Sequence, residues 1–185
     1  MTKLKLFRIS FIYIGLAILL SFVPIAGGAD EVSDNIDALH STSVAKRADA
    51  AEALAKLHSR KAIHSLIVAL ADPVEPVRAQ ALRALAATVK RADVPLLIRT
   101  LNSPNIPTQI GAARLLAIFG DRRAGDSLIA LVGTNDLTLK AAVTDALAKI
   151  GDPRAAASLR SGLQNKNARI RMKTAYALGD RKSVV

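Results

Sequence analysis

The sequence contains no cysteine or tryptophan, and aromatic residues make up only 3% of its 185 positions. Without cysteine the chain has no disulfides, thiolate zinc sites or thiol nucleophiles, which excludes a small disulfide-stapled scaffold and any cysteine enzyme. The shortage of aromatic side chains argues against the stacking platforms that bind single-stranded nucleic acids. Hydrophobic residues still account for 51% of the chain, mainly as alanine and leucine, so the composition indicates one helical domain with a small-residue and aliphatic core.

The N-terminal segment has the layout of a secretory signal peptide. Three basic residues, all within the first eight, come before an uncharged apolar stretch over residues 9–25. The small residues that follow favour cleavage after Ala29. We therefore expect residues 1–29 to be removed on export and the mature protein to be periplasmic. The alternative is an uncleaved inner-membrane anchor formed by residues 9–25, a length at the short limit for a hydrocarbon core of about 30 Å.

The formal net charge of +11 is distributed unevenly along the chain. Removal of the signal segment takes away three positive charges and leaves +8. Residues 30–45 sum to −4, residues 46–152 to +5 and residues 153–185 to +7. The basic C-terminal end predicts attraction to an anionic envelope surface or to the acidic end of another copy, and a solvated capping face is the simpler alternative.

A 31-residue period organises the rest of the chain. One leucine recurs at this spacing without insertion or deletion, as Leu54, Leu85, Leu116, Leu147 and Leu178. A polar set keeps the same period and consists of Arg47, Arg78, Gln109, Lys140 and Arg171. Such repeats are typical of solenoids, in which each unit buries its apolar face against its neighbours. We interpret the polar ladder as inter-repeat hydrogen bonds rather than as a phosphate-binding track.

Each unit contains two helical patterns separated by turn residues. In the second unit, apolar residues at helical spacing over residues 77–89 predict a first helix, and residues 94–101 predict a shorter second helix. Gly120-Asp121 and Gly151-Asp152 mark turns in which glycine ends one helix and aspartate caps the next. One hairpin cannot bury its own apolar face, so the predicted fold is all-α, an α-solenoid of stacked antiparallel helical hairpins.

These motifs resemble the HEAT-like repeats first noted in phycobilisome lyase subunits. The family pattern V-R-x-x-A-x-x-A-L appears as Val77-Arg78 with Ala81, Ala84 and Leu85, and L-G-D-P-R-A is matched by Gly151-Asp152-Pro153-Arg154-Ala155. The resemblance covers roughly residues 32–180. It implies the solenoid fold and a role as a protein-binding scaffold, and it carries little information about activity.

The two ends depart from the regular repeat. Residues 30–45 carry four acidic and no Lys or Arg side chains and match a second-helix stripe, so we predict an acidic half-repeat that caps the first full unit. Residues 46–185 hold the HEAT-like repeats, of which the last is incomplete. The final helix is either itself a cap, or it leaves an apolar flank near Leu159, Leu163 and Tyr176 for a partner. A truncated reading frame is a third explanation.

No residues follow a known catalytic or metal-binding motif. His58 and His64 lack the H-x-x-x-H spacing, and a metal site would need a third ligand beside them. The HEAT-like deoxyhypusine hydroxylases, which the chain also resembles in fold, hold iron with His-Glu dipeptides, and none occurs here. Bilin lyase activity conflicts with the export signal. We expect Asp121 and Asp152 to be helix caps, and we predict no catalytic, cofactor-binding or metal residue and no small-molecule substrate.

The predicted function is that of an exported, non-enzymatic scaffold with a protein partner. The candidate binding surfaces are the concave face expected from the second helices and the basic end. Their candidate partner-binding residues are His64, Arg99, Asn102, Asp126, Gln164, Arg169, Arg171 and Lys173. The alternatives are an accessory docking subunit of a lyase- or hydroxylase-related complex, and an envelope-associated protein that binds anionic surfaces through its basic end. Nucleic acid is disfavoured as a partner because the mature chain is poor in aromatic residues and carries the export signal.

Overall fold

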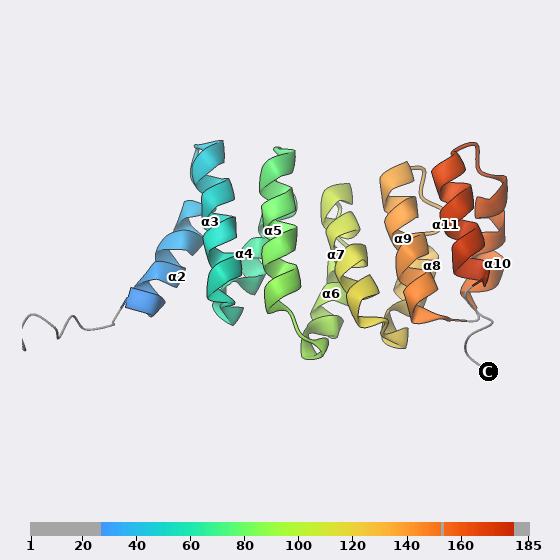
Figure 1. Ribbon diagram of the computed structural model, residues 1–185, viewed down its shortest axis with the longest axis horizontal. Helices are drawn as coiled ribbons and strands as arrows, with labels where there is room; N and C mark the ends of the chain where they lie inside the picture. The colour runs from blue at the N-terminus through green and yellow to red at the C-terminus, as the bar shows by residue number, and fades with distance from the viewer. Residues whose placement is uncertain (1–26, 153, 180–185) are drawn as a thin grey trace, which may run out of the picture.

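The structure, a computed structural model, describes residues 27–152 and 154–179. Within these residues every regular element is helical, which confirms the predicted all-α class. The helices form a single row of hairpins that runs from the N-terminal to the C-terminal side of the molecule (Figure 1). None of the described helices has the length and apolar character needed to cross a bilayer.

Five helices form one layer, which we call the first-helix layer. They are α3 Val44–Leu57, α5 Glu75–Thr88, α7 Ile106–Phe119, α9 Leu137–Ile150 and α11 Ala168–Gly179. Each begins 31 residues after the one before it, so the sequence period is also the structural period. Consecutive members pack against one another in chain order.

The shorter helices form the second-helix layer, and most of them begin with a turn of 3₁₀ helix. In chain order they are α2 Gly27–Ala38, η1 Arg60–Ala62 with α4 Ile63–Ala69, η2 Arg91–Asp93 with α6 Val94–Thr100, η3 Arg122–Ala124 with α8 Gly125–Ala130, and α10 Ala155–Arg160 with η4 Ser161–Gln164. Each of α4, α6, α8 and α10 packs against the first helix of the following unit. The core is therefore shared between neighbouring units rather than closed within each hairpin.

The leucine ladder forms the centre of this core. Leu54, Leu85 and Leu116 are fully buried, and Leu147 is 2% exposed. The alanines at one repeat position of the first helices, Ala50, Ala81 and Ala112, are also buried, so small side chains lie between the packed helices.

The hairpin turns follow the predicted chemistry with one addition. Gly120 and Gly151 end α7 and α9 in the left-handed region, at φ values of 55° and 64°. His58, at the equivalent position after α3, adopts the same conformation with φ 47°. A non-glycine residue is uncommon in this region, so this left-handed turn was not predicted from the sequence.

The predicted signal segment lies almost entirely outside the described residues. Residues 1–26 are not described, and the expected cleavage point after Ala29 falls in the first turn of α2. Helix α2 itself packs against α3 and η1. Val32 of α2 and Leu39 directly after it are buried, while Glu31, Asp34 and Asp37 are exposed.

Candidate protein-binding surfaces

The polar ladder on the first helices binds the loops between units. Arg78 donates from Nη1 to the carbonyl oxygens of Asp72 and Pro73, at 2.7 and 2.9 Å. Arg171 makes the same pair of bonds to the loop before α11, both at 2.9 Å. The other ladder members that bind a preceding carbonyl are Arg47 and Gln109. For these four residues the interpretation as structural hydrogen bonds is confirmed.

Buried aspartates occupy the turns within the hairpins. Asp121 accepts the backbone N–H of Arg123 at 3.0 Å, and the Arg123 guanidinium binds both carboxylate oxygens. This arginine hydrogen bond lowers the pKa of Asp121 to about 2. Arginine hydrogen bonds also lower the pKa of Asp93, which is held by Arg60 of the preceding unit, and of Asp152. Asp121 is thus the N-cap of η3, as predicted, and Asp152 accepts the backbone N–H of Arg154 at 2.9 Å in the equivalent turn. Both ionised carboxylates already have partners.

The histidines do not gather into a metal site. In the described part of the chain, no three His, Cys, Asp or Glu residues lie where they would hold a metal ion together. His58 places Nδ1 3.2 Å from the carbonyl oxygen of Ala87 in the next unit, and His64 is exposed on α4. His58 therefore contributes a contact between units.

The eight predicted partner-binding residues lie in both layers rather than at one site. His64, Arg99, Asn102, Asp126 and Gln164 belong to the second-helix layer, where all five are exposed. Arg169, Arg171 and Lys173 lie on α11, in the first-helix layer. Arg171 is bound to loop carbonyls, and Lys173 forms an ion pair with Asp145 of α9. Within the part of the chain that the structure describes, Arg169 is exposed and its side chain makes no contact of this kind, so the three cations offer less free charge than the sequence indicates.

The second-helix layer carries a shallow groove between α4 and α6. Its volume is about 420 Å³, and its lining includes Ile67, Val68, Arg99 and Asn102. Val68 is 63% exposed, which is unusual for a large aliphatic side chain. Two of the predicted residues, Arg99 and Asn102, therefore lie together beside an apolar contact point.

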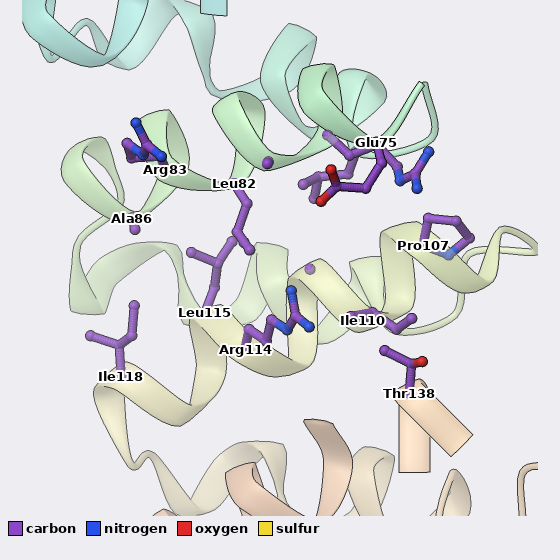
Figure 2. A pocket seen from close by; sticks show the side chains of 14 residues that line it. Glu75, Leu82, Arg83, Ala86, Pro107, Ile110, Arg114, Leu115, Ile118 and Thr138 are labelled. Atoms are coloured by element: carbon purple, nitrogen blue, oxygen red, sulfur yellow. The ribbon is translucent and has the colours of Figure 1, made fainter. Parts of the chain in front are cut away.

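A larger groove lies in the first-helix layer, between α5 and α7. Its volume is about 580 Å³, and its lining is mostly apolar. Figure 2 shows Leu82 of α5 pointing toward Leu115 of α7, with Ile110 and Ile118 on either side of Leu115 along α7. Ile118 is 62% exposed. Binding was predicted from the sequence on the second helices, at the basic end or on the apolar flank of the last unit, and not in this groove.

The groove forms where the alanine pattern of the first helices is interrupted. Position 82 holds leucine, whereas the equivalent residues one period away are Ala51 and Ala113, both fully buried. Position 110 holds isoleucine, whereas its equivalents in the neighbouring units are Ala79 and Ala141. Helices α5 and α7 approach each other less closely than α3 and α5 or α7 and α9, as the wider gap in Figure 1 illustrates. Larger side chains at close-contact positions hold two helices apart, so these two substitutions account for the gap.

Like charges face each other across this groove. One position of the first helices reads Glu52, Arg83, Arg114 and Asp145 at the 31-residue spacing. Arg83 and Arg114 are exposed and line the groove from its two sides. Among the described residues neither guanidinium forms a hydrogen bond or ion pair, although Glu52 lies near enough for Arg83 to influence its pKa. The groove thus combines an apolar floor with two available cations.

Comparisons with known proteins point to one repeat family. The family described as HEAT repeats matches residues 32–105 and 94–179. A search of curated proteins found no match.

Among solved structures, the complex of CpcE and CpcF of phycocyanin lyase from Nostoc sp. PCC7120 matches with 29% identity and a TM-score of 0.63, covering 80% of this chain and 64% of that one. The chain therefore spans less than two thirds of the length of that relative. An archaeal HEAT-like repeats protein from Thermococcus onnurineus NA1 is 21% identical, with a TM-score of 0.51 and coverage of 84% and 76%. Human deoxyhypusine hydroxylase is 15% identical, with a TM-score of 0.50 and coverage of 84% and 75%. The last two likenesses concern the fold alone.

Proposed function

Because this chain belongs to the HEAT-repeat family, we propose that it is a non-enzymatic scaffold that binds another protein. The observation that carries the proposal is the open surface of the repeats, where exposed apolar side chains lie in grooves beside exposed polar side chains. Val68 with Arg99 and Asn102 is the example on the second-helix layer. Shallow extended grooves of this kind suit a protein surface better than a small molecule, which needs a concave, enclosing pocket.

The state of the carboxylates supports the non-enzymatic part of the proposal. A general acid or base works best with a pKa near the working pH. The pKa values of the buried aspartates at the hairpin turns are instead lowered, away from neutral pH, and the pKa of Asp121 is about 2. They are structural anions that stabilise turns.

We also propose that the protein is exported, because a basic, apolar and small-residue order is typical of residues cleaved by signal peptidase. Cleavage after Ala29 would leave Asp30 and Glu31 at the start of α2, where negative charge is favourable to a helix. N-terminal sequencing of the protein recovered from the periplasmic fraction tests this. A chain that begins at Asp30 is expected, an intact N-terminus in the membrane fraction would identify the anchor over residues 9–25, and an intact N-terminus in the cytosol would refute export.

A second candidate is an accessory docking subunit of an enzyme complex. The specific observation in its favour is the similarity to the CpcE and CpcF complex of phycocyanin lyase, in which two chains associate. In this version the partner is an enzyme or another repeat subunit, and this chain supplies binding surface. The two candidates differ in whether the identified partner has catalytic activity that changes when this chain is bound.

Site-specific photocrosslinking tests the scaffold proposal. The photoreactive residue p-benzoylphenylalanine is placed at Val68 in the second-helix groove, at Ile118 in the first-helix groove, or at the exposed control position Lys56 on α3. We expect one protein to be captured at Val68 or Ile118 and not at Lys56. That protein is then purified, and its binding to the unmodified full chain is measured by calorimetry. Equal adducts at all three positions, or no binding by the purified candidate, would contradict the proposal.

A further inference from the structure

We infer that the groove between α5 and α7 is a docking site for an amphipathic helix with acidic borders, supplied by a partner protein. This inference rests on the proposed function and gives it a location and a partner chemistry. It places binding on the first-helix layer, opposite to the layer that the sequence pattern favours.

The shape of the groove suits a helix. Its lining runs from Glu75 to Ala86 on α5 and from Pro107 to Ile118 on α7. Eleven residue steps at 1.5 Å correspond to about 16 Å, or about three helical turns. The two walls are neighbouring helices of one layer, so a third helix can lie along them with its side chains between theirs.

The apolar floor favours a helix over an extended peptide. The floor includes Leu70, Leu82, Ile110 and Leu115, and these side chains provide no hydrogen-bond donors or acceptors. An extended segment lying on them would leave its backbone N–H and C=O groups without partners on that side. A helix satisfies these groups internally and presents apolar residues spaced three and four apart to the groove.

The charges around the groove indicate the sign of the charge that the partner should carry. Three arginines, Arg78, Arg83 and Arg114, line it together with one carboxylate, Glu75. Arg78 is already bound to loop carbonyls, and Arg83 and Arg114 lie on opposite walls without hydrogen-bond or ion-pair partners in the described residues. At the junction of α9 and α11, by contrast, Lys173 and Asp145 are of opposite sign and form an ion pair. Acidic residues on both borders of an incoming apolar stripe would each meet one arginine, which complements the groove.

The test uses a synthetic probe. The probe is a labelled peptide of about 18 residues, long enough for the groove, with leucine at helical spacing and glutamate on both borders of the leucine stripe. A second peptide has lysine in place of each glutamate. Binding to the full chain is measured by fluorescence anisotropy at low and moderate salt. We expect saturable binding of the acidic peptide and at least about tenfold weaker binding of the basic one.

Three variants locate the binding. Arg83→Glu with Arg114→Glu should weaken the binding of the acidic peptide by about tenfold or more and strengthen the binding of the basic peptide. The matched control, Lys61→Glu with Arg160→Glu, makes the same change in net charge on exposed residues of the second-helix layer that line neither groove, and it should leave the binding of both peptides unchanged. Leu82→Ala with Ile110→Ala restores the alanines of the neighbouring units, so it should narrow the groove and abolish binding while thermal unfolding reports an intact fold.

The outcomes separate this inference from the proposed function. No saturable binding, binding that the control variant abolishes, or binding that is indifferent to both groove variants would overturn the docking site. If the photocrosslinked protein instead attaches at Val68 and its affinity is unchanged by the groove variants, the scaffold function stands and the groove is not its site. If no protein is captured while the acidic peptide binds as expected, the groove chemistry stands and the scaffold proposal fails.

Discussion

At the scale of single residues, the charged side chains of this protein act mainly between repeats. Arg47 reaches Asp72 in the loop that leads to the next unit at 2.6 Å, and Arg60 reaches Asp93 of the next unit at 2.7 Å. Each of these aspartates also accepts a backbone N–H, so one carboxylate stabilises a turn and joins two units. Because the carboxylates are nearly buried and hydrogen-bonded, losing one arginine would leave an anion with too few partners.

The aspartate at the α7–η3 turn predicts a specific pH dependence. The pKa of Asp121 is lowered to about 2 from 3.8, so the unfolded chain binds its proton more tightly than the folded one. The free energy of unfolding is therefore expected to fall as the pH drops from about 5 to about 2. Asp121→Asn should unfold at a lower temperature than the wild type at pH 7 and should lose less stability over this acid range. Thermal unfolding followed by circular dichroism checks this, with the exposed Asp34→Asn as control; parallel acid profiles for Asp121→Asn and the wild type would contradict it.

At the scale of elements, helix starts depend on short polar caps. Helix α9 begins after Asp136, whose Oδ1 accepts the backbone N–H of Leu139 at 2.7 Å. Helix α7 begins after Asn105, whose side chain makes no such cap bond. Both helices are 14 residues long and occupy equivalent places in consecutive units, so the two positions form a matched pair.

This pair yields a direct prediction. Asp136→Ala should reduce the free energy of unfolding by about 1 kcal/mol, because it leaves the first turn of α9 without its acceptor. Asn105→Ala should change it by no more than a few tenths of that amount, since no cap bond is lost. Urea unfolding of both variants measures the difference. Equal losses would show that the cap bond of Asp136 does not stabilise α9.

At the scale of the whole molecule, the solenoid is a chain of neighbour contacts with one weaker junction. The α3–α5 and α7–α9 pairs pack closely, whereas α5 and α7 are separated by the groove. In such an array stability is approximately the sum of unit and junction contributions, so a loose junction divides the cooperative unit. We therefore expect the gap that creates the candidate docking site also to weaken the coupling between the unfolding of the N-terminal half and that of the C-terminal half.

Buried-leucine variants test this division. Leu54→Ala removes a fully buried side chain on the N-terminal side of the groove and should cost about 2–5 kcal/mol. Hydrogen exchange measured by mass spectrometry should then increase over residues 27–103 more than over residues 106–179. Leu147→Ala, on the other side, should give the reverse pattern. A uniform increase in both variants would show that the molecule unfolds as one unit across the α5–α7 junction.

Local pattern was enough to predict the architecture from the sequence. The 31-residue leucine ladder, the glycines at 120 and 151 and the aspartates that follow them predicted two helices per unit, and α5 and α6 lie where residues 77–89 and 94–101 placed them. These features can be predicted because helix periodicity and turn chemistry depend on residues close in sequence. In a repeat protein the same local pattern also occurs several times, which strengthens the prediction.

Which side chains pair with each other, and where the surface is grooved, depends on the tertiary structure. The sequence did not indicate that Lys173 pairs with Asp145, or that the candidate residues of the second helices and of α11 lie in different layers. Leu82 and Ile110 were visible as departures from alanine, but their effect depends on both lying at the same helix–helix contact. The sequence by itself determined a solenoid of helical hairpins, since each unit obeys the same local rules. Only packing between units determined where two neighbours separate, because that spacing depends on side chains from both helices at once.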